Sequence, residues 1–279
     1  MAEPVRSSAE WVAYFQANAA NLKEVPWHAG AGVTAEEIDR IAESLRAWQL
    51  GETSDGRHLL LAAENYAAEV GDPEFLAAVR LFILEEQRHG AELGRFLDLA
   101  EVPRATWDWG DAIFRAFRYC LPRMEIWATV VVMVETHAML YYAAIRRATG
   151  SEVLRRICEQ ILHDEVPHIR FQSERLAILH RDRSRTLLGL TLAVHRALFA
   201  GITLAVWVAH RRALRAGGFS FRRFWRTAWA KMNGVWARID PLRYSWPEFD
   251  GAAEPSLSRR ANVNSTTPMP TVSSTNAAV

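Results

Sequence analysis

Two pairs of residues in this chain each place a glutamate three positions before a histidine. They are Glu86 with His89 and Glu165 with His168. Residues three apart lie on the same face of a helix, so each pair could bind one ion together. Carboxylates suit hard cations such as iron or manganese, and imidazole suits iron, manganese and zinc. One such pair is a weak signal, but two of them predict a metal site.

A third carboxylate lies level with the second pair. A helical turn is expected at residues 150–151, and Glu135 and Glu165 stand about fifteen residues before and after it. They should therefore face each other across a helical hairpin. Glu135 ends the apolar run 130–134, where a carboxylate is costly unless it is paired or bound to a metal. A salt bridge to a buried cation is the alternative.

The first hairpin needs a matching carboxylate. Its turn is expected near Gly71, and Glu86 lies about fourteen residues beyond it. The partner should lie fourteen to twenty residues before the turn. Glu52 fits this window at its edge, with Asp55 as a competitor, and we choose Glu52 as the fourth carboxylate.

The elements that position these residues are all helical. Thr34 and Glu37 form a capping box that starts a long helix, and Pro73 suits the first position of another. Two tight hairpins joined by the connection 101–121, which contains a short helix, predict an all-α fold. Expected helices are 8–22, 34–70, 73–100, 122–149, 152–180, 184–216 and one from about 220.

The six residues in this order resemble the ferritin-like di-iron carboxylate proteins, whose ligands are one Glu from each of two helices and a Glu-x-x-His from each of two others. The resemblance covers 34–180 and implies a ferritin-like four-helix bundle with one long crossover. By resemblance, Glu86 and Glu165 bridge two iron ions, with manganese an alternative. Glu52 and Glu135 are terminal ligands, and each histidine binds one metal.

The resemblance also implies an activity. We expect a non-haem oxidase or oxygenase that uses O2 and an external electron donor to oxidise a small organic substrate, free or carrier-bound. Iron oxidation and storage is the alternative, and a tRNA-modifying hydroxylase is less favoured. Three neighbours of the ligands are candidates for supporting roles. Asp164 and Glu85 could each reach the histidine of the opposite hairpin, and Tyr142 is either redox-active or a hydrogen-bonding core residue.

The region 205–240 is basic and aromatic. Either its aromatic face packs on the bundle while the arginines face water, or the arginines bind an acidic partner, an anionic membrane surface or RNA. The first interpretation is favoured. The candidate partner-binding residues are Arg211, Arg212, Arg215, Arg222, Arg223 and Arg226.

Composition limits the remaining possibilities. The 33 basic and 32 acidic residues leave a net charge of +1, which points to no class of charged partner. Two cysteines without a CxxC pair and the lack of a secretory signal indicate a cytoplasmic protein. The apolar segment 187–209 is expected to be a buried or dimer-forming helix rather than a membrane span, in a monomer or homodimer. Expected domains are 1–33, a bundle 34–182, an extension 183–250 and a disordered tail 251–279.

Overall fold

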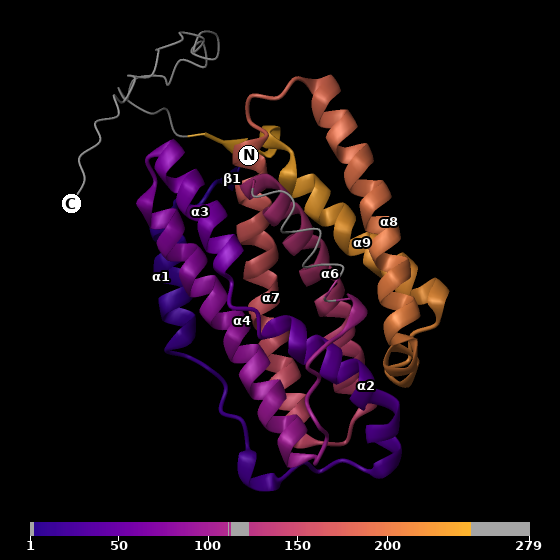
Figure 1. Ribbon diagram of the computed structural model, residues 1–279. Coiled ribbons are helices and arrows are strands. Elements are labelled where there is room, and N and C mark those ends of the chain that lie inside the picture. The colour runs from indigo at the N-terminus through magenta and orange to yellow at the C-terminus, as the bar shows by residue number, and fades with distance from the viewer. Residues whose placement is uncertain (1–2, 111, 113–122, 247–279) are drawn as a thin grey trace, which may run out of the picture. The chain divides into compact units, whose positions relative to one another are not determined.

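The computed structural model describes residues 3–110, 112 and 123–246 (Figure 1). The chain divides into one unit, Met1–Ser245, and a second from Trp246, of which only Trp246 is described. The first unit is helical, which confirms the all-α prediction. Among the described residues the only strands are β1 (Glu3–Pro4) and β2 (Tyr244–Ser245), which pair in parallel. The predicted tail 251–279, the helix start at 122 and residues 111 and 113–121 of the connection lie outside the described residues.

Two long antiparallel helices form the second hairpin. They are α6 (Met124–Ala148) and α7 (Glu152–Leu179). Ser151 caps α7 as expected, since its hydroxyl accepts a hydrogen bond from the Leu154 amide at 3.1 Å. The turn therefore falls where the sequence predicts it, and it sets Glu135 level with Glu165.

The second helix of the first hairpin is α4 (Pro73–Leu99). Gly71 adopts φ 71°, a left-handed conformation that ends the preceding helix. Asp72 then accepts a hydrogen bond from the Phe75 amide at 3.2 Å and caps α4. The start of this helix agrees with the prediction from Asp72 and Pro73.

The expected continuous helix 34–70 is wrong in its middle. The structure has α2 (Ala35–Glu52) and α3 (Arg57–Val70) with a break at 53–56. Gly56 adopts φ 66°, and a Cβ there would meet the Ile83 side chain at 2.7 Å. Only glycine combines this backbone conformation with such close packing. The break makes Glu52 the last residue of α2.

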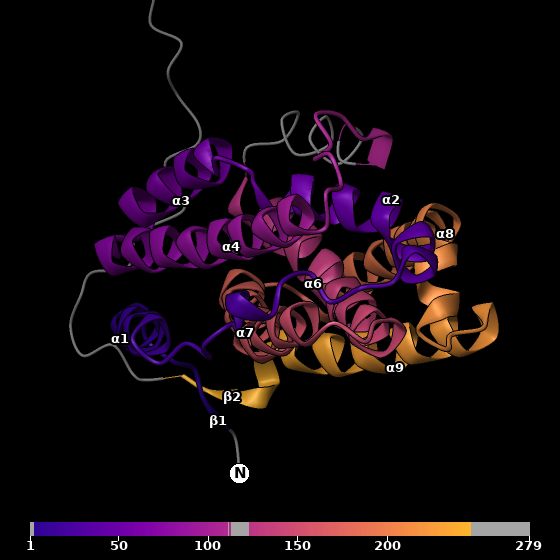
Figure 2. The same ribbon diagram turned by 90° about the horizontal axis from the view of Figure 1, so that it is seen from below.

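Further helices surround the two hairpins. Figure 2 shows α6 and α7 with α4 on one side and α9 (Phe221–Ile239) on the other, while α8 (Arg185–Ala216) packs on α6 and α2. Helix α1 (Ser8–Ala19) packs on α4. Single-turn 3-10 helices occupy Trp27–Ala29 and Pro241–Arg243. Helices α1, α8 and α9 thus cover the two hairpins on several sides.

Two helices are long and apolar enough to cross a membrane by length and composition. In α6 the apolar window is 78% buried, which identifies it as a core helix of the bundle. In α8 the corresponding window is only 22% buried. The segment 187–209, expected to be buried or dimer-forming, is therefore covered along one side only.

Candidate metal centre

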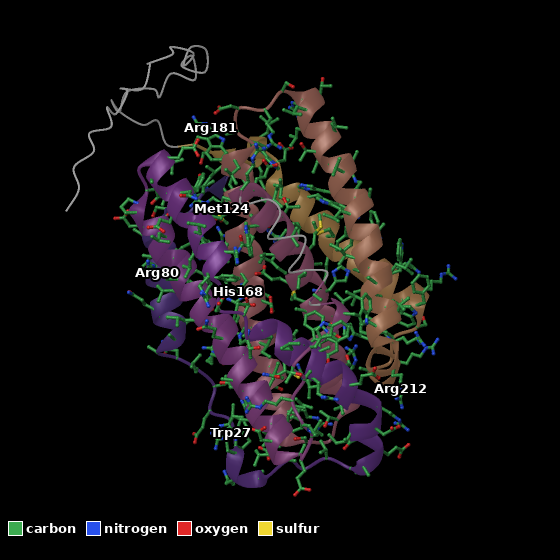
Figure 3. The ribbon with its side chains drawn as sticks, viewed as in Figure 1. Trp27, Arg80, Met124, His168, Arg181 and Arg212 are labelled. Atoms are coloured by element: carbon green, nitrogen blue, oxygen red, sulfur yellow. The ribbon has the colours of Figure 1, made fainter. Side chains whose placement is uncertain are left out.

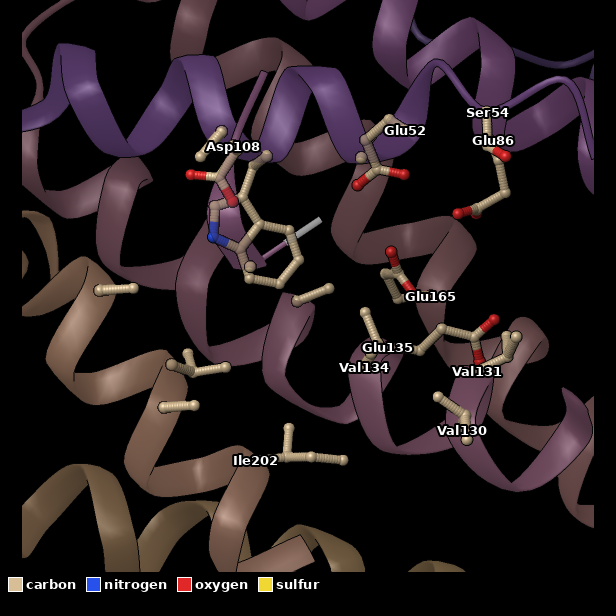
Figure 4. Close-up of a pocket in the computed structure, with 18 of the residues that line it drawn as sticks. Glu52, Ser54, Glu86, Asp108, Val130, Val131, Val134, Glu135, Glu165 and Ile202 are labelled. Atoms are coloured by element: carbon tan, nitrogen blue, oxygen red, sulfur yellow. The ribbon is translucent and has the colours of Figure 1, made fainter. Parts of the chain in front are cut away.

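The six residues chosen from the sequence come together inside the bundle. Each of two groups offers three potential ligand atoms within 4.8 Å of one another, and Glu86 belongs to both. Figure 3 places His168 among the helices, and Figure 4 shows the four glutamates around one space. The contributing elements are α2 for Glu52, α4 for Glu86 and His89, α6 for Glu135, and α7 for Glu165 and His168.

The two histidines are held in matching orientations. His89 Nε2 lies 3.0 Å from Asp164 Oδ2, and His168 Nε2 lies 2.8 Å from Glu85 Oε2. Each contact joins a histidine of one hairpin to a carboxylate of the other, as the sequence positions led us to expect. Because each carboxylate accepts a hydrogen bond from Nε2–H, each ring turns its Nδ1 toward the cluster.

Both Nδ1 atoms point at one carboxylate. Glu86 Oε1 lies 3.7 Å from His89 Nδ1 and 3.1 Å from His168 Nδ1. Glu165 Oε2 lies 3.9 Å from His168 Nδ1. Glu86 is therefore placed between the two candidate metal positions, whereas Glu165 belongs to one group only. Glu135 belongs to neither group, although its carboxylate is buried beside them.

Several polar atoms of this cluster are buried without a hydrogen-bond partner. Buried polar groups in proteins almost always have partners, so a convergent set without them indicates a ligand. The atoms face one another rather than the backbone or solvent, and this donor set of carboxylate oxygens and imidazole nitrogens fits divalent iron or manganese. They are Glu86 Oε1, His89 Nδ1, both oxygens of Glu135, Glu165 Oε2 and His168 Nδ1.

The pKa values of three of the four glutamates show that their charged forms are destabilised by burial and by mutual repulsion. Burial and the charge of Glu86 raise the pKa of Glu52 and of Glu165 well above the ordinary value. Burial raises the pKa of Glu135 to about 8. Burial would also raise the pKa of Glu86, but the adjacent His168, whose Nδ1 lies 3.1 Å from Oε1, and the charge of His89 lower it to about 2. Cations bound among these groups would stabilise their charged forms.

A residue that the sequence did not single out joins the two supporting carboxylates. Asn18 Nδ2 donates to Glu85 Oε1 at 2.7 Å and to Asp164 Oδ1 at 2.8 Å. Asn18 follows Trp11 and Phe15 on the buried face of α1. A polar residue at this position of an apolar stripe was the available signal. Helix α1 therefore helps to fix both histidines.

Tyr142 and Gly90 support Glu52. The Tyr142 hydroxyl donates to Glu52 Oε1 at 2.7 Å, so the structure gives this tyrosine a hydrogen-bonding position beside the cluster. A Cβ on Gly90 would lie 2.8 Å from Thr53 Cγ2 and 3.0 Å from the Glu52 carbonyl carbon. Gly90 thus allows α4 to approach the end of α2 closely.

A cavity of about 390 Å³ opens beside the cluster. The four glutamates lie at one end, and side chains of α2, α6 and α8 form the walls (Figure 4). Phe82, Ile83 and Val131 line the cavity close to the glutamates. The sequence did not indicate the contribution of α8, because no local pattern in 185–216 shows which helices it packs against. Residues of α6 and α8 on opposite walls include Trp127, Val130, Val134, Leu198, Ile202 and Val206.

The basic region is arranged as the packing interpretation predicts. Phe224 and Trp236 of α9 are buried, while all six candidate arginines are exposed. Arg212, near the end of α8 (Figure 3), pairs with Asp39 at 2.9 Å. Arg215 and Arg223 lie over the rings of Trp207 and Phe219. Binding of an acidic partner by these residues stays a prediction.

Comparison with known proteins adds no assignment: no family model, no curated protein and no solved structure matches this chain. The site must therefore be interpreted from its own geometry.

Proposed function

We propose that the chain is a ferritin-like di-iron protein that activates O2 to oxidise an organic substrate. The observation that carries the proposal is the convergent set of buried ligand atoms without a hydrogen-bond partner on α4, α6 and α7, with each histidine fixed through its Nε2. Two iron ions bound there would supply the electrons that reduce O2 while the substrate is oxidised. An external donor would restore those electrons.

The residues of the chain have distinct roles in this proposal. Glu86 would bind both ions, because its Oε1 faces both histidines. His89 and His168 would each bind one ion through Nδ1, with Asp164 and Glu85 holding the rings in place. Glu52 and Glu165 would complete opposite halves of the site, and Glu135 would add a further carboxylate from α6.

The cavity favours an organic substrate over iron storage. Among the described residues that line it, acidic groups are limited to the four glutamates of the cluster and Asp108. A path for incoming iron ions would need carboxylates along its length, whereas aliphatic and aromatic walls bind organic molecules and exclude water. An organic molecule bound between these walls would displace water from the metal centre.

Metal binding tests the proposal directly. Purified protein, stripped of metal and titrated with Fe²⁺ under nitrogen, should bind two ions per chain. His168→Ala and Glu135→Ala should each reduce this number or weaken binding at least tenfold, whereas Glu64→Gln on the exposed side of α3 should bind normally. Absence of Fe²⁺ and Mn²⁺ binding by the folded protein would overturn the proposal. A large shell that retains hundreds of ions would instead assign iron storage.

A further inference from the structure

The cavity beside the glutamates has a definite size and chemistry. Its 390 Å³ is about two and a half times a cavity of roughly 150 Å³ that holds one benzene molecule, so it fits roughly fifteen non-hydrogen atoms. No lysine or arginine is found among the described residues that line it. A ligand carboxylate or phosphate inside the cavity would therefore lack a counter-charge.

The cavity is open to solvent at one end and closed by the glutamates at the other. Gly51, Ala205 and Ala209 on its rim are exposed, while Glu135 and Glu165 at its other end are buried. Between these ends, Val130 and Val134 of α6 face Ile202 of α8 (Figure 4). A molecule that enters between α2 and α8 would reach the glutamates with its far end.

We propose that this cavity binds an uncharged, mainly apolar chain molecule of roughly fifteen non-hydrogen atoms, with one end at the metal centre and the other between α2 and α8. The fate of the molecule rests on the proposed function, but its binding does not. Binding should follow the length of the chain, because each buried methylene contributes about fourfold in affinity until the cavity is filled.

The experiment uses metal-free, full-length protein and a series of straight-chain primary alcohols with six to eighteen carbons. Trp48, Trp109 and Trp127 line the cavity, so their fluorescence reports occupancy. Affinity should rise about fourfold per carbon and level off near fifteen. The matching carboxylates should bind at least tenfold more weakly. Equal binding of alcohols and carboxylates, or affinity without dependence on length, would overturn the inference.

A substitution that fills part of the cavity tests whether the alcohols bind there. Ile202→Trp should shift the plateau to shorter chains, while Leu61→Trp on the exposed face of α3 should leave it unchanged. Circular dichroism and a cooperative urea unfolding transition verify that Ile202→Trp is folded. An unchanged plateau in a folded Ile202→Trp variant would overturn the inference. If the alcohols fail while the chain binds two Fe²⁺, only the cavity inference falls; if they bind without any Fe²⁺ binding, only the proposed function falls.

The outer face of α8 carries a separate feature. Seven exposed apolar residues follow one another at alternating steps of three and four, the spacing of a coiled-coil seam. Arg196 lies beside this row, with its guanidinium over the Trp236 ring of α9. We call the row the α8 seam; it consists of Leu187, Leu190, Val194, Ala197, Gly201, Leu204 and Val208.

Six of the seven residues of the α8 seam match one another when the helix is reversed, and Leu187 falls opposite Arg211. About a midpoint at residue 199, Val194 is opposite Leu204 and Ala197 is opposite Gly201. Leu190 is likewise opposite Val208. A two-fold axis pairs each position with its counterpart, and the small central residues let the helices approach closely. We infer that the seam binds a second copy of this chain as an antiparallel helix pair.

Sedimentation of the full chain tests this inference. The wild type should be a dimer, and Val194→Glu or Leu204→Glu should be a monomer, whereas Leu61→Glu on exposed α3 should stay a dimer. The double variant V194E/L204K should recover the dimer, because each glutamate then faces a lysine of the other copy. A monomeric wild type, or a monomeric V194E/L204K beside a dimeric wild type, would overturn the inference.

Salt separates self-association from membrane binding. Arg185 and Arg211 flank the seam, and an antiparallel pair brings them near each other across the two copies. Raising the salt should therefore tighten the dimer by screening their repulsion. Binding of a monomeric chain to anionic phospholipid vesicles, weakened by salt, would overturn the inference in favour of a membrane surface.

Discussion

His168 and Glu85 form the contact that orients one side of the candidate metal centre. The 2.8 Å hydrogen bond from His168 Nε2 to Glu85 Oε2 crosses from α7 to α4. Since Glu85 fixes the proton on Nε2, Nδ1 stays free to bind metal. Asp164 makes the equivalent contact with His89. Neither acid lies among the ligand groups, so we expect both to act by positioning the histidines.

Replacing Glu85 by alanine should weaken metal binding tenfold to a hundredfold while two ions still bind at saturation. Glu85→Gln should weaken binding less, because its amide oxygen can still accept a hydrogen bond from Nε2–H of His168. Competition with a chelator under nitrogen, using Fe²⁺ and Mn²⁺, measures both affinities. A Glu85→Ala protein with wild-type affinity would show that the ring is oriented by packing against Phe82 and Phe15 instead.

Tyr142 should contribute most when no metal is bound. Its hydroxyl donates to the buried Glu52 carboxylate, and Tyr142→Phe leaves one oxygen of that carboxylate without a partner. We expect a loss of about 1–2 kcal/mol in unfolding free energy for the metal-free protein. Metal bound to Glu52 should reduce this loss. Urea unfolding with and without Mn²⁺ measures the difference, with Tyr14→Phe on α1 as the control; equal losses in the two states would contradict the assignment of Glu52 as a ligand.

Replacing Gly90 should displace the Glu52 carboxylate. The Cβ of Gly90→Ala would press on the backbone at Glu52 and Thr53, so α2 must move away from α4. We expect a destabilisation of about 1–3 kcal/mol together with weaker metal binding. Gly189→Ala is a matched control, because that glycine is also helical and a Cβ added to it would meet nothing within 4 Å. It should stabilise the protein by about 0.5–1 kcal/mol; a similar gain for Gly90→Ala would refute the close approach.

The sequence predicted those parts of the site that depend on distance along a helix. Turn positions and helical rise place Glu135 level with Glu165, because both follow from one hairpin. The break at 53–56 was missed, since it depends on Ile83 packing against Gly56 from another helix. Asn18 and Ile202 come from helices that meet the site only in the folded chain. A helical period identifies the face of α1 or α8 that is buried, but not what covers it.

His195 should make the fold less stable in acid. It is 5% exposed on α8, and its Nε2 lies 3.3 Å from the Thr129 hydroxyl of α6. Burial, reinforced by the nearby His180, lowers the pKa of His195 from 6.5 to about 4, although Glu125 opposes this shift. The unfolded chain therefore takes up this proton more readily than the folded chain. Stability is lost as the pH falls from about 6.5 toward 4.

His195→Leu should remove this contribution. Between pH 7 and pH 5 the wild type should lose about 2 kcal/mol more unfolding free energy than the variant. Urea unfolding of the metal-free proteins at the two pH values measures the difference, and His28→Leu at the unburied His28 serves as the control. Because both proteins keep the other histidines, those groups cancel in the comparison. Parallel losses in wild type and His195→Leu would mean that His195 is protonated in the folded chain, and the packing of α8 on α6 would then have to accommodate a charge.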